Sequence, residues 1–110
     1  MFETVVIATD GSGSAERAVK AALDLAAHFD ATVHALYVVD SSEVEDKPDD
    51  IRDTLERALA TTGGHALTFV HEAAEADGAD DVVTAVREGD PAEQVIQYAT
   101  EKDADVIATG

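Results

Sequence analysis

The sequence predicts an α/β fold built on a doubly wound, open parallel sheet, and two patterns carry this prediction. Short apolar runs of β-branched residues recur along the 110 residues, which is typical of strands buried on both faces. Stretches with helical spacing separate these runs, so the element order is βαβαβαβ. Right-handed crossovers then favour a doubly wound sheet, for which we expect the strand order 3-2-1-4.

The first strand and helix follow from the opening residues. Residues 5–8 are Val-Val-Ile-Ala, a short apolar run that ends in the turn-forming residues 9–14. Residues 15–29 then carry alanine, valine, leucine and phenylalanine at helical spacing. We expect Ser12 or Ser14 to cap this helix.

The next segment predicts a strand and a long helix. Residues 32–39 are rich in valine, leucine and tyrosine and indicate a second buried strand. Residues 40–50 form a polar, acidic loop. From residue 51 to residue 73 the apolar positions keep one helical phase through Gly63 and Gly64, although each glycine weakens a helix. One long helix is the expected structure, with two helices as the alternative.

The last third predicts a strand, a helix and a final strand. Residues 82–86 form the third strand. Asp90, Pro91 and Glu93 stand where a helix takes its N-cap, first and third residues, so a helix begins there. Residues 105–108 form the fourth strand.

The charge balance excludes several classes of function. The chain has 24 acidic residues against 7 basic ones, a formal net charge of −17. Nucleic acids and anionic membranes are therefore excluded as partners, because both attract basic surfaces. The acidity also indicates a halophilic source, where concentrated salt screens the repulsion among acidic side chains.

Other features point to the cytoplasm and away from metal or thiol chemistry. There is no cysteine, so thiolate catalysis and disulfides are excluded. No apolar run reaches the length of a membrane span, and the start of the chain does not resemble a signal peptide. The histidines His28, His34, His65 and His71 lack the spacing of metal ligands. We expect a cytoplasmic protein without a metal site.

Two separated segments should meet at one edge of the sheet. If the first and fourth strands are neighbours, residues 9–14 and Thr109-Gly110 lie together at the carboxyl ends of the strands, where open α/β sheets bind ligands. The following helix offers unpaired N–H groups to an anion. The alternative is an ordinary strand-to-helix turn with capping residues.

The residues at this edge suit a nucleotide. Asp10 is placed to accept hydrogen bonds from ribose hydroxyls, and Gly11 allows the backbone to approach a ligand closely. Val38 and Val39, at the end of the second strand, are placed to contact adenine.

Four segments resemble the universal stress protein family. They are Val5–Ser12, Leu36–Asp40, Val86–Glu93 and Asp103–Gly110, and they are distributed from residue 5 to residue 110, so the resemblance covers essentially the whole chain. The Arg-Glu-Gly-Asp-Pro sequence inside the third segment is the most specific match.

The resemblance implies a five-stranded parallel sheet that holds an adenine nucleotide, ATP or AMP, with Mg²⁺ as a possible companion. It implies that Asp10 contacts the ribose, that Val38 contacts adenine, and that Gly110 opens a glycine-rich phosphate loop. The later glycines of that loop, the last helix and the fifth strand are absent, so we expect residues 1–110 to be one C-terminally incomplete domain. The family also implies a homodimer of the full-length parent. The expected nucleotide-binding residues are Ala8, Thr9, Asp10, Gly11, Ser12, Val38, Val39, Thr109 and Gly110.

Three functions stay open, of which the first is the expectation. It is a stress-response protein that binds an adenine nucleotide and has no catalytic residues, hence not an enzyme. The second is a nucleotide-free interaction or dimerisation module of the same fold. The third is a dinucleotide-binding oxidoreductase. Gly11 and Gly13 match the first two glycines of the dinucleotide-binding fingerprint, and Asp40 partly matches its acidic residue. Glu16 disfavours this alternative, because the fingerprint requires a glycine or alanine at that position.

Overall fold

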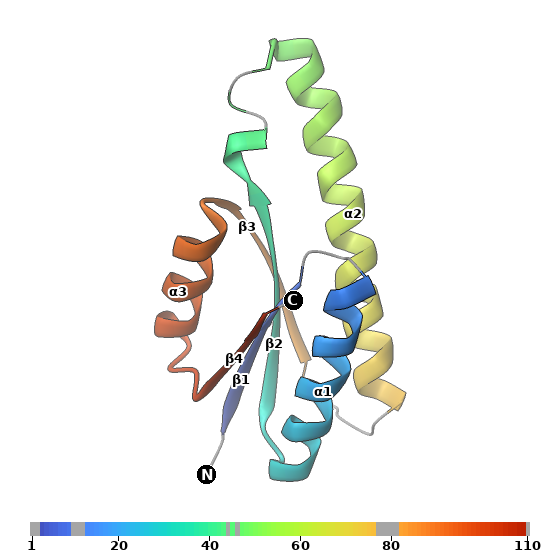
Figure 1. Cartoon of the computed structure of the whole chain (residues 1–110), viewed down its shortest axis with the longest axis vertical. Coiled ribbons are helices and arrows are strands. Elements are labelled where there is room, and N and C mark those ends of the chain that lie inside the picture. Colours follow the sequence, from blue (N-terminus) through green and yellow to red (C-terminus); the bar gives the residue numbers. More distant parts are fainter. Residues whose placement is uncertain (1–2, 10–12, 44, 46, 77–81, 110) are drawn as a thin grey trace.

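A parallel sheet with helices on both faces forms the architecture (Figure 1). The computed structural model describes residues 3–9, 13–43, 45, 47–76 and 82–109. Within them the strands lie in the order β3-β2-β1-β4, all parallel, which confirms the predicted fold class and strand order. The elements are β1 (Thr4–Ala8), α1 (Gly13–Phe29), β2 (Thr32–Asp40), the short 3-10 helix η1 (Ser41–Glu43), α2 (Asp49–Ala76), β3 (Val82–Gly89), α3 (Pro91–Glu101) and β4 (Val106–Thr109).

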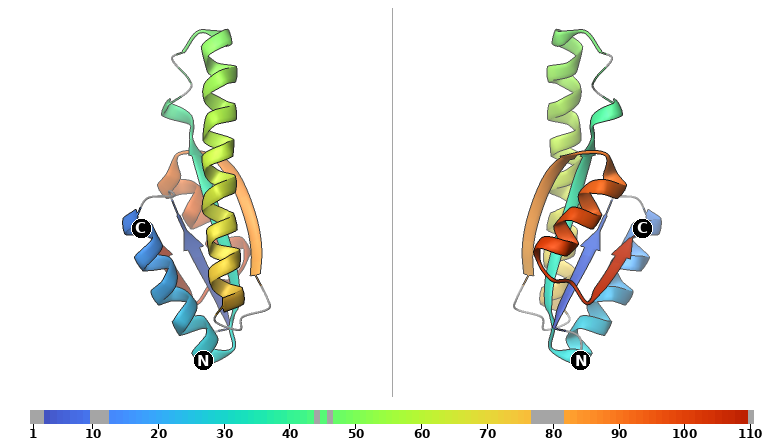
Figure 2. Two further views of the ribbon diagram at one scale, coloured as in Figure 1. Left: turned by 90° about the vertical axis from the view of Figure 1, so that its right-hand side faces the viewer. Right: turned by 90° about the vertical axis from the view of Figure 1, so that its left-hand side faces the viewer.

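The two faces of the sheet bury cores of unequal size. Helices α1 and α2 cover one face and α3 covers the other (Figures 1 and 2). Because successive strand residues point to opposite faces, Val5 and Ile7 of β1 enter the larger core under α1 and α2, whereas Val6 enters the smaller one under α3. The buried members of the smaller core are Val6, Leu36, Tyr98 and Ala99.

One carboxylate holds β4 beside β1 at the amino ends of these two strands, which is the end of the sheet opposite the predicted site. An Asp105 side-chain oxygen accepts hydrogen bonds from the backbone N–H groups of Glu3, at 2.8 Å, and Thr4, at 3.0 Å. These two donors hold the pKa of Asp105 below its usual range, since they favour the charged form. The contact fixes the register that pairs Ala8 with Thr109 at the other end of the two strands.

Helix α2 is one continuous helix of 28 residues through Gly63 and Gly64, so the expected single helix is confirmed and the alternative of two helices is wrong. Its first half extends beyond the end of β2 (Figure 1). No helix in the described part of the chain is both long and apolar enough to cross a membrane.

Most predicted boundaries differ from the structure by one to three residues; β4, for example, is Val106–Thr109 where residues 105–108 were expected. Strand β3 continues three residues past Val86 to Gly89, because backbone pairing with β2 persists after the apolar run has ended. Gly89 has φ of +150°, a conformation that favours glycine, at the turn into α3. Ser14 lies inside α1, which begins at Gly13, so Ser14 is not its cap; Ser12 lies outside the described residues.

The predicted start of α3 is confirmed. Asp90 is the N-cap, and its carboxylate accepts a hydrogen bond from the backbone N–H of Glu93 at 3.1 Å. Pro91 occupies the first turn, where its missing N–H costs nothing. The sequence motif therefore fixes the point at which the chain leaves β3 and crosses the sheet.

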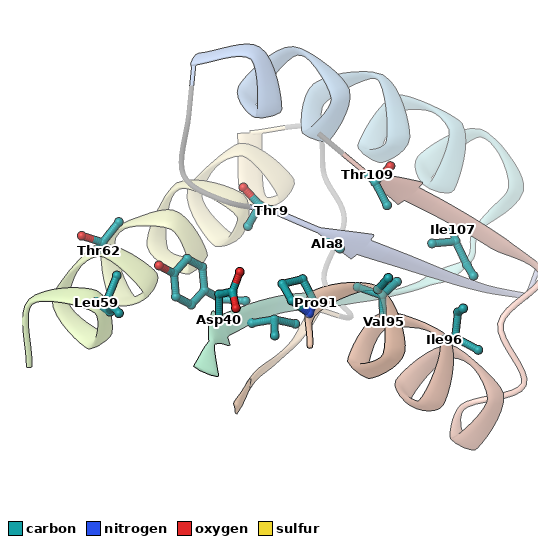
Figure 3. A pocket seen from close by; sticks show the side chains of 13 residues that line it. Ala8, Thr9, Asp40, Leu59, Thr62, Pro91, Val95, Ile96, Ile107 and Thr109 are labelled. Atoms are coloured by element: carbon teal, nitrogen blue, oxygen red, sulfur yellow. The ribbon is translucent and has the colours of Figure 1, made fainter. Parts of the chain in front are cut away.

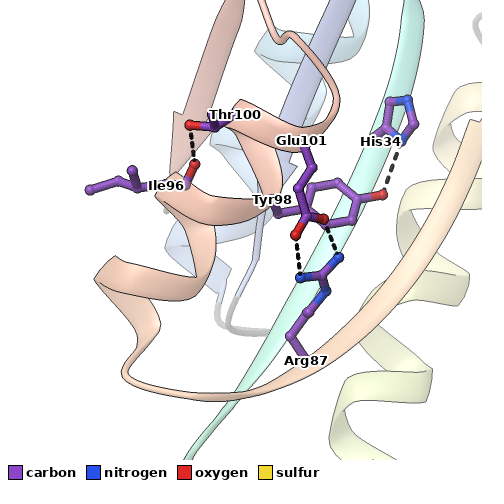
Figure 4. Close-up of polar contacts among 6 residues, drawn as sticks. All are labelled: His34, Arg87, Ile96, Tyr98, Thr100 and Glu101. Carbon is purple, nitrogen blue, oxygen red and sulfur yellow. Dashed lines mark hydrogen bonds and ion pairs between the residues drawn. The ribbon is translucent and has the colours of Figure 1, made fainter.

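A polar cluster borders the smaller core (Figure 4). The Nδ1 atom of His34 lies 2.9 Å from the hydroxyl of Tyr98. The Arg87 guanidinium and the Lys102 ammonium group lie 5.1 and 5.6 Å from the centre of the same tyrosine ring, and Arg87 forms an ion pair with Glu101 at 2.6 Å. Burial first, and Lys102 second, lower the pKa of His34 below the 6.5 of a free histidine.

This cluster predicts a loss of stability in mild acid. The unfolded chain takes up a proton on His34 as the pH falls through about 6.5, before the folded protein does. The contribution of neutral His34 is therefore complete above that pH and falls as the pH drops toward its lower folded pKa. Between pH 7.5 and pH 5.5, the free energy of unfolding measured with urea should fall less for His34→Gln than for the wild type. His28→Gln, on the exposed end of α1, should behave like the wild type; an equal loss in all three proteins would contradict the prediction.

Candidate functional site

A cavity of about 780 Å³ opens at the carboxyl ends of β1, β2 and β4, between α2 and α3 (Figure 3). We call it the main cavity. It lies at the ends of the neighbouring strands β1 and β4, where the strand order reverses, which is the ligand-binding point of doubly wound sheets. Its volume falls within the range of small-molecule sites. The lining residues are Ala8, Thr9, Tyr37, Val38, Asp40, Leu59, Thr62, Pro91, Ala92, Val95, Ile96, Ile107 and Thr109.

The two helices make the apolar walls. Helix α3 begins directly after the carboxyl end of β3, so its first turns border the cavity, where Val95 and Ile96 are among its lining residues. Leu59 and Thr62 of α2, three residues apart on one helical face, form the facing wall (Figure 3). The sequence did not identify these residues as part of the site, although the Asp90 cap predicted where α3 begins.

Of the nine residues predicted to bind nucleotide, four line the main cavity: Ala8, Thr9, Val38 and Thr109. Ala8 pairs in register with Thr109, so Thr9 and Thr109, the described ends of the two separated segments, lie at the same end of the sheet. Val39 does not line the cavity. It points to the opposite face of the sheet and is buried in the larger core.

The remaining four predicted residues, Asp10, Gly11, Ser12 and Gly110, lie outside the described residues. Their roles stay predictions.

The carboxylate of Asp40 is held in place at the rim of the main cavity. Its Oδ1 atom accepts hydrogen bonds from the backbone N–H of Ser42 at 3.0 Å and from the Ser42 hydroxyl at 2.7 Å. From the sequence, Asp40 is a candidate ligand contact only in the dinucleotide-binding alternative. It is the one charged side chain among the described residues that line this cavity.

A smaller side cavity of about 230 Å³ adjoins the main one between α1 and α2. Thr9 and Thr62 line both cavities, so these two residues stand at their common wall. Glu16 and His65 give the side cavity a more polar lining. The described residues contain no group of three or more side chains suited to a metal ion, in either cavity or elsewhere.

The arrangement suits binding of a partly apolar ligand. Apolar side chains from the sheet and α3 surround the space, and the hydroxyl groups of Thr9, Thr62 and Thr109 border it. Such a lining, apolar with a few polar groups that fix orientation, is typical of cofactor and nucleotide sites. Among the described lining residues of the main cavity there is no histidine, lysine or arginine that would assist a reaction.

Comparisons with known proteins agree with this architecture. A relative from Methanocaldococcus jannaschii, a universal stress protein, is 36% identical over 111 residues; the match covers all of this chain and 65% of the relative. A solved universal stress protein in complex with cAMP superposes with a TM-score of 0.77 at 28% identity, covering 97% of this chain and 75% of that one. A family member from Burkholderia pseudomallei gives a TM-score of 0.81 at 31% identity, with 99% and 81% covered.

The family model gives the most extensive match. The model of the universal stress protein family matches residues 1–110, the whole chain. The predicted resemblance is thereby confirmed, and this chain belongs to the universal stress protein family.

Proposed function

We propose that this domain binds an adenine nucleotide in the main cavity and serves in a stress response, as a binding protein and not as an enzyme. One observation carries the proposal: β1 and β4, about a hundred residues apart in sequence, end side by side at a large apolar cavity on the switch point of the sheet.

The lining suggests how the ligand would lie. The base would rest among apolar side chains, with Val38 and Val95 on the sheet and α3 sides. The sugar would then lie toward Thr9 and Thr109, the residues that directly precede Asp10 and Gly110. Asp10 remains our expected partner for the ribose hydroxyls. The relative solved with cAMP supports this proposal, since it shares the fold at 28% identity.

Isothermal titration calorimetry tests the proposal. AMP should bind the wild-type domain, and Val95→Glu should weaken binding by at least about tenfold, because it places a carboxylate where apolar contact is needed. Val86→Glu is the matched control, since Val86 is 56% exposed on β3 and does not line the cavity. Circular dichroism would confirm that both variants are folded. Absence of binding in the wild type, or equal affinity in Val95→Glu, would contradict the proposal.

A further inference from the structure

We infer that the site selects among adenine nucleotides by charge: it binds a nucleotide with one phosphate group more tightly than ATP, unless a divalent cation accompanies the ATP. The inference rests on the proposed function and concerns which ligand the same site takes. Three features of the charge distribution support it.

The first feature is the position of the cations. Every lysine and arginine of the sequence lies within the described residues, and none lines the main or the side cavity. Several have other contacts: Arg87 pairs with Glu101, and Arg52 donates a hydrogen bond to the carbonyl of Glu45 at 2.8 Å. The seven residues are Arg17, Lys20, Lys47, Arg52, Arg57, Arg87 and Lys102.

The second feature is a fixed negative charge. Asp40 lines the main cavity, and its hydrogen bonds to Ser42 hold the carboxylate in place. No positive side chain in the described lining offsets it. An anionic ligand anywhere in this cavity therefore meets repulsion from Asp40 and no ion pair from the described lining.

The third feature is that most backbone N–H groups at the N-terminus of α3, which borders the cavity, are already satisfied by Asp90. A helix N-terminus attracts anions through its unpaired N–H groups. In α3, Pro91 has no N–H, and the Asp90 carboxylate accepts the hydrogen bond of the Glu93 N–H. The carboxylates of Asp90 and Glu93 both lie at the positive end of the helix, where an anionic ligand would otherwise be favoured.

Charge alone then ranks the ligands. ATP carries about two more negative charges than AMP, and the described lining has no cation for them. The net charge of −17 adds a field of the same sign. We expect ATP without a divalent cation to bind about tenfold more weakly than AMP, since each added charge meets a screened repulsion of modest size. Mg²⁺ bound to the phosphates should remove most of this difference.

The experiment is a calorimetric series with adenosine, AMP and ATP, each with EDTA and again with Mg²⁺, at 0.1 and 1 M KCl. In EDTA, AMP should bind more tightly than ATP, and raising the salt should strengthen ATP binding, because salt screens repulsion. A site that attracts phosphate through cations would show the opposite dependence on salt. The sign of the change thus separates the two kinds of site without reference to absolute affinity.

Asp40→Asn sharpens the test. An asparagine oxygen can still accept the hydrogen bonds of Ser42, so the turn is kept while the charge is removed. This variant should gain about fivefold in ATP affinity in EDTA and change little for adenosine. Asp24→Asn removes the same charge from the exposed face of α1, away from both cavities, and should leave both affinities unchanged.

The outcomes separate this inference from the proposed function. If ATP in EDTA binds as tightly as AMP, or if salt weakens its binding, the charge selection is wrong while adenine binding stands. If neither adenosine nor any nucleotide binds under any condition, the proposed function fails as well.

Discussion

Replacing Gly63 by alanine should destabilise the domain by about 2 kcal/mol, although alanine is the better helix former. Gly63 is buried on α2 directly above the ring of Tyr37 in β2. A Cβ atom there would contact ring atoms of Tyr37, lying 2.7 Å from Cε1 and 3.0 Å from Cγ. The contact reaches the base of a ring that is itself 5% exposed, so the ring, α2 or β2 must shift to relieve it.

The neighbouring glycine provides the matched control. A Cβ atom on Gly64 would meet nothing within 4 Å. Gly64→Ala should therefore stabilise the domain by about 0.5–1 kcal/mol, because alanine lowers the entropy cost of the helix without a clash. Urea unfolding of the two variants should shift the midpoint in opposite directions. Shifts of the same sign would show that the close packing of α2 on Tyr37 does not decide the stability at this point.

The Gly63 variant should also affect the main cavity, because Tyr37 belongs to its lining. A displaced ring would alter the wall between β2 and α2, and AMP affinity should fall in Gly63→Ala but not in Gly64→Ala. Comparing the two variants thus tests whether the packing of α2 on Tyr37 affects ligand binding in the main cavity.

The strand order and the position of α3 were predictable from the sequence because local signals there agree with tertiary structure. The apolar runs mark the strands, although only β1 and β2 are buried on both faces and the outer strands β3 and β4 keep exposed residues. The cap residues of α3 act within one turn of the helix. The end of β3 was not predictable in this way. Its last three residues are held by backbone pairing with β2, which leaves no trace in the side-chain pattern.

The site was predictable only in part, for a similar reason. Ala8, Val38 and Thr109 followed from the rule that ligands bind at the carboxyl ends of parallel strands. Leu59 and Thr62 could not be found, because they depend on how far α2 extends past the sheet, and that extension is set by the packing of the whole helix. Val39 was chosen with Val38 as a neighbour in sequence, yet adjacent strand residues face opposite sides, and it lies in the core.

Replacing Tyr98 by alanine should cost about 3–5 kcal/mol, the largest effect expected for a single substitution in this domain. Tyr98 is 2% exposed and is the largest buried side chain in the small core between α3 and the sheet. In that core Val6, Leu36 and Ala99 are its buried companions, so no other large group can fill the space that the ring would leave. A loss of this size is a large part of the 5–15 kcal/mol that stabilises a typical domain.

Graded variants keep the test decisive if Tyr98→Ala does not fold. Tyr98→Phe retains the ring beneath Arg87 and removes only the hydroxyl that meets His34, so it should cost about 1 kcal/mol (Figure 4). Ile96→Ala, on the same helix but 62% exposed, should change stability by less than about 0.5 kcal/mol. Unfolding free energies from urea titration should follow the order Ile96→Ala, Tyr98→Phe, Tyr98→Ala. If Tyr98→Ala cost no more than Tyr98→Phe, the ring would contribute little to packing α3 on the sheet. Other contacts would then have to hold α3 in its position beside the main cavity.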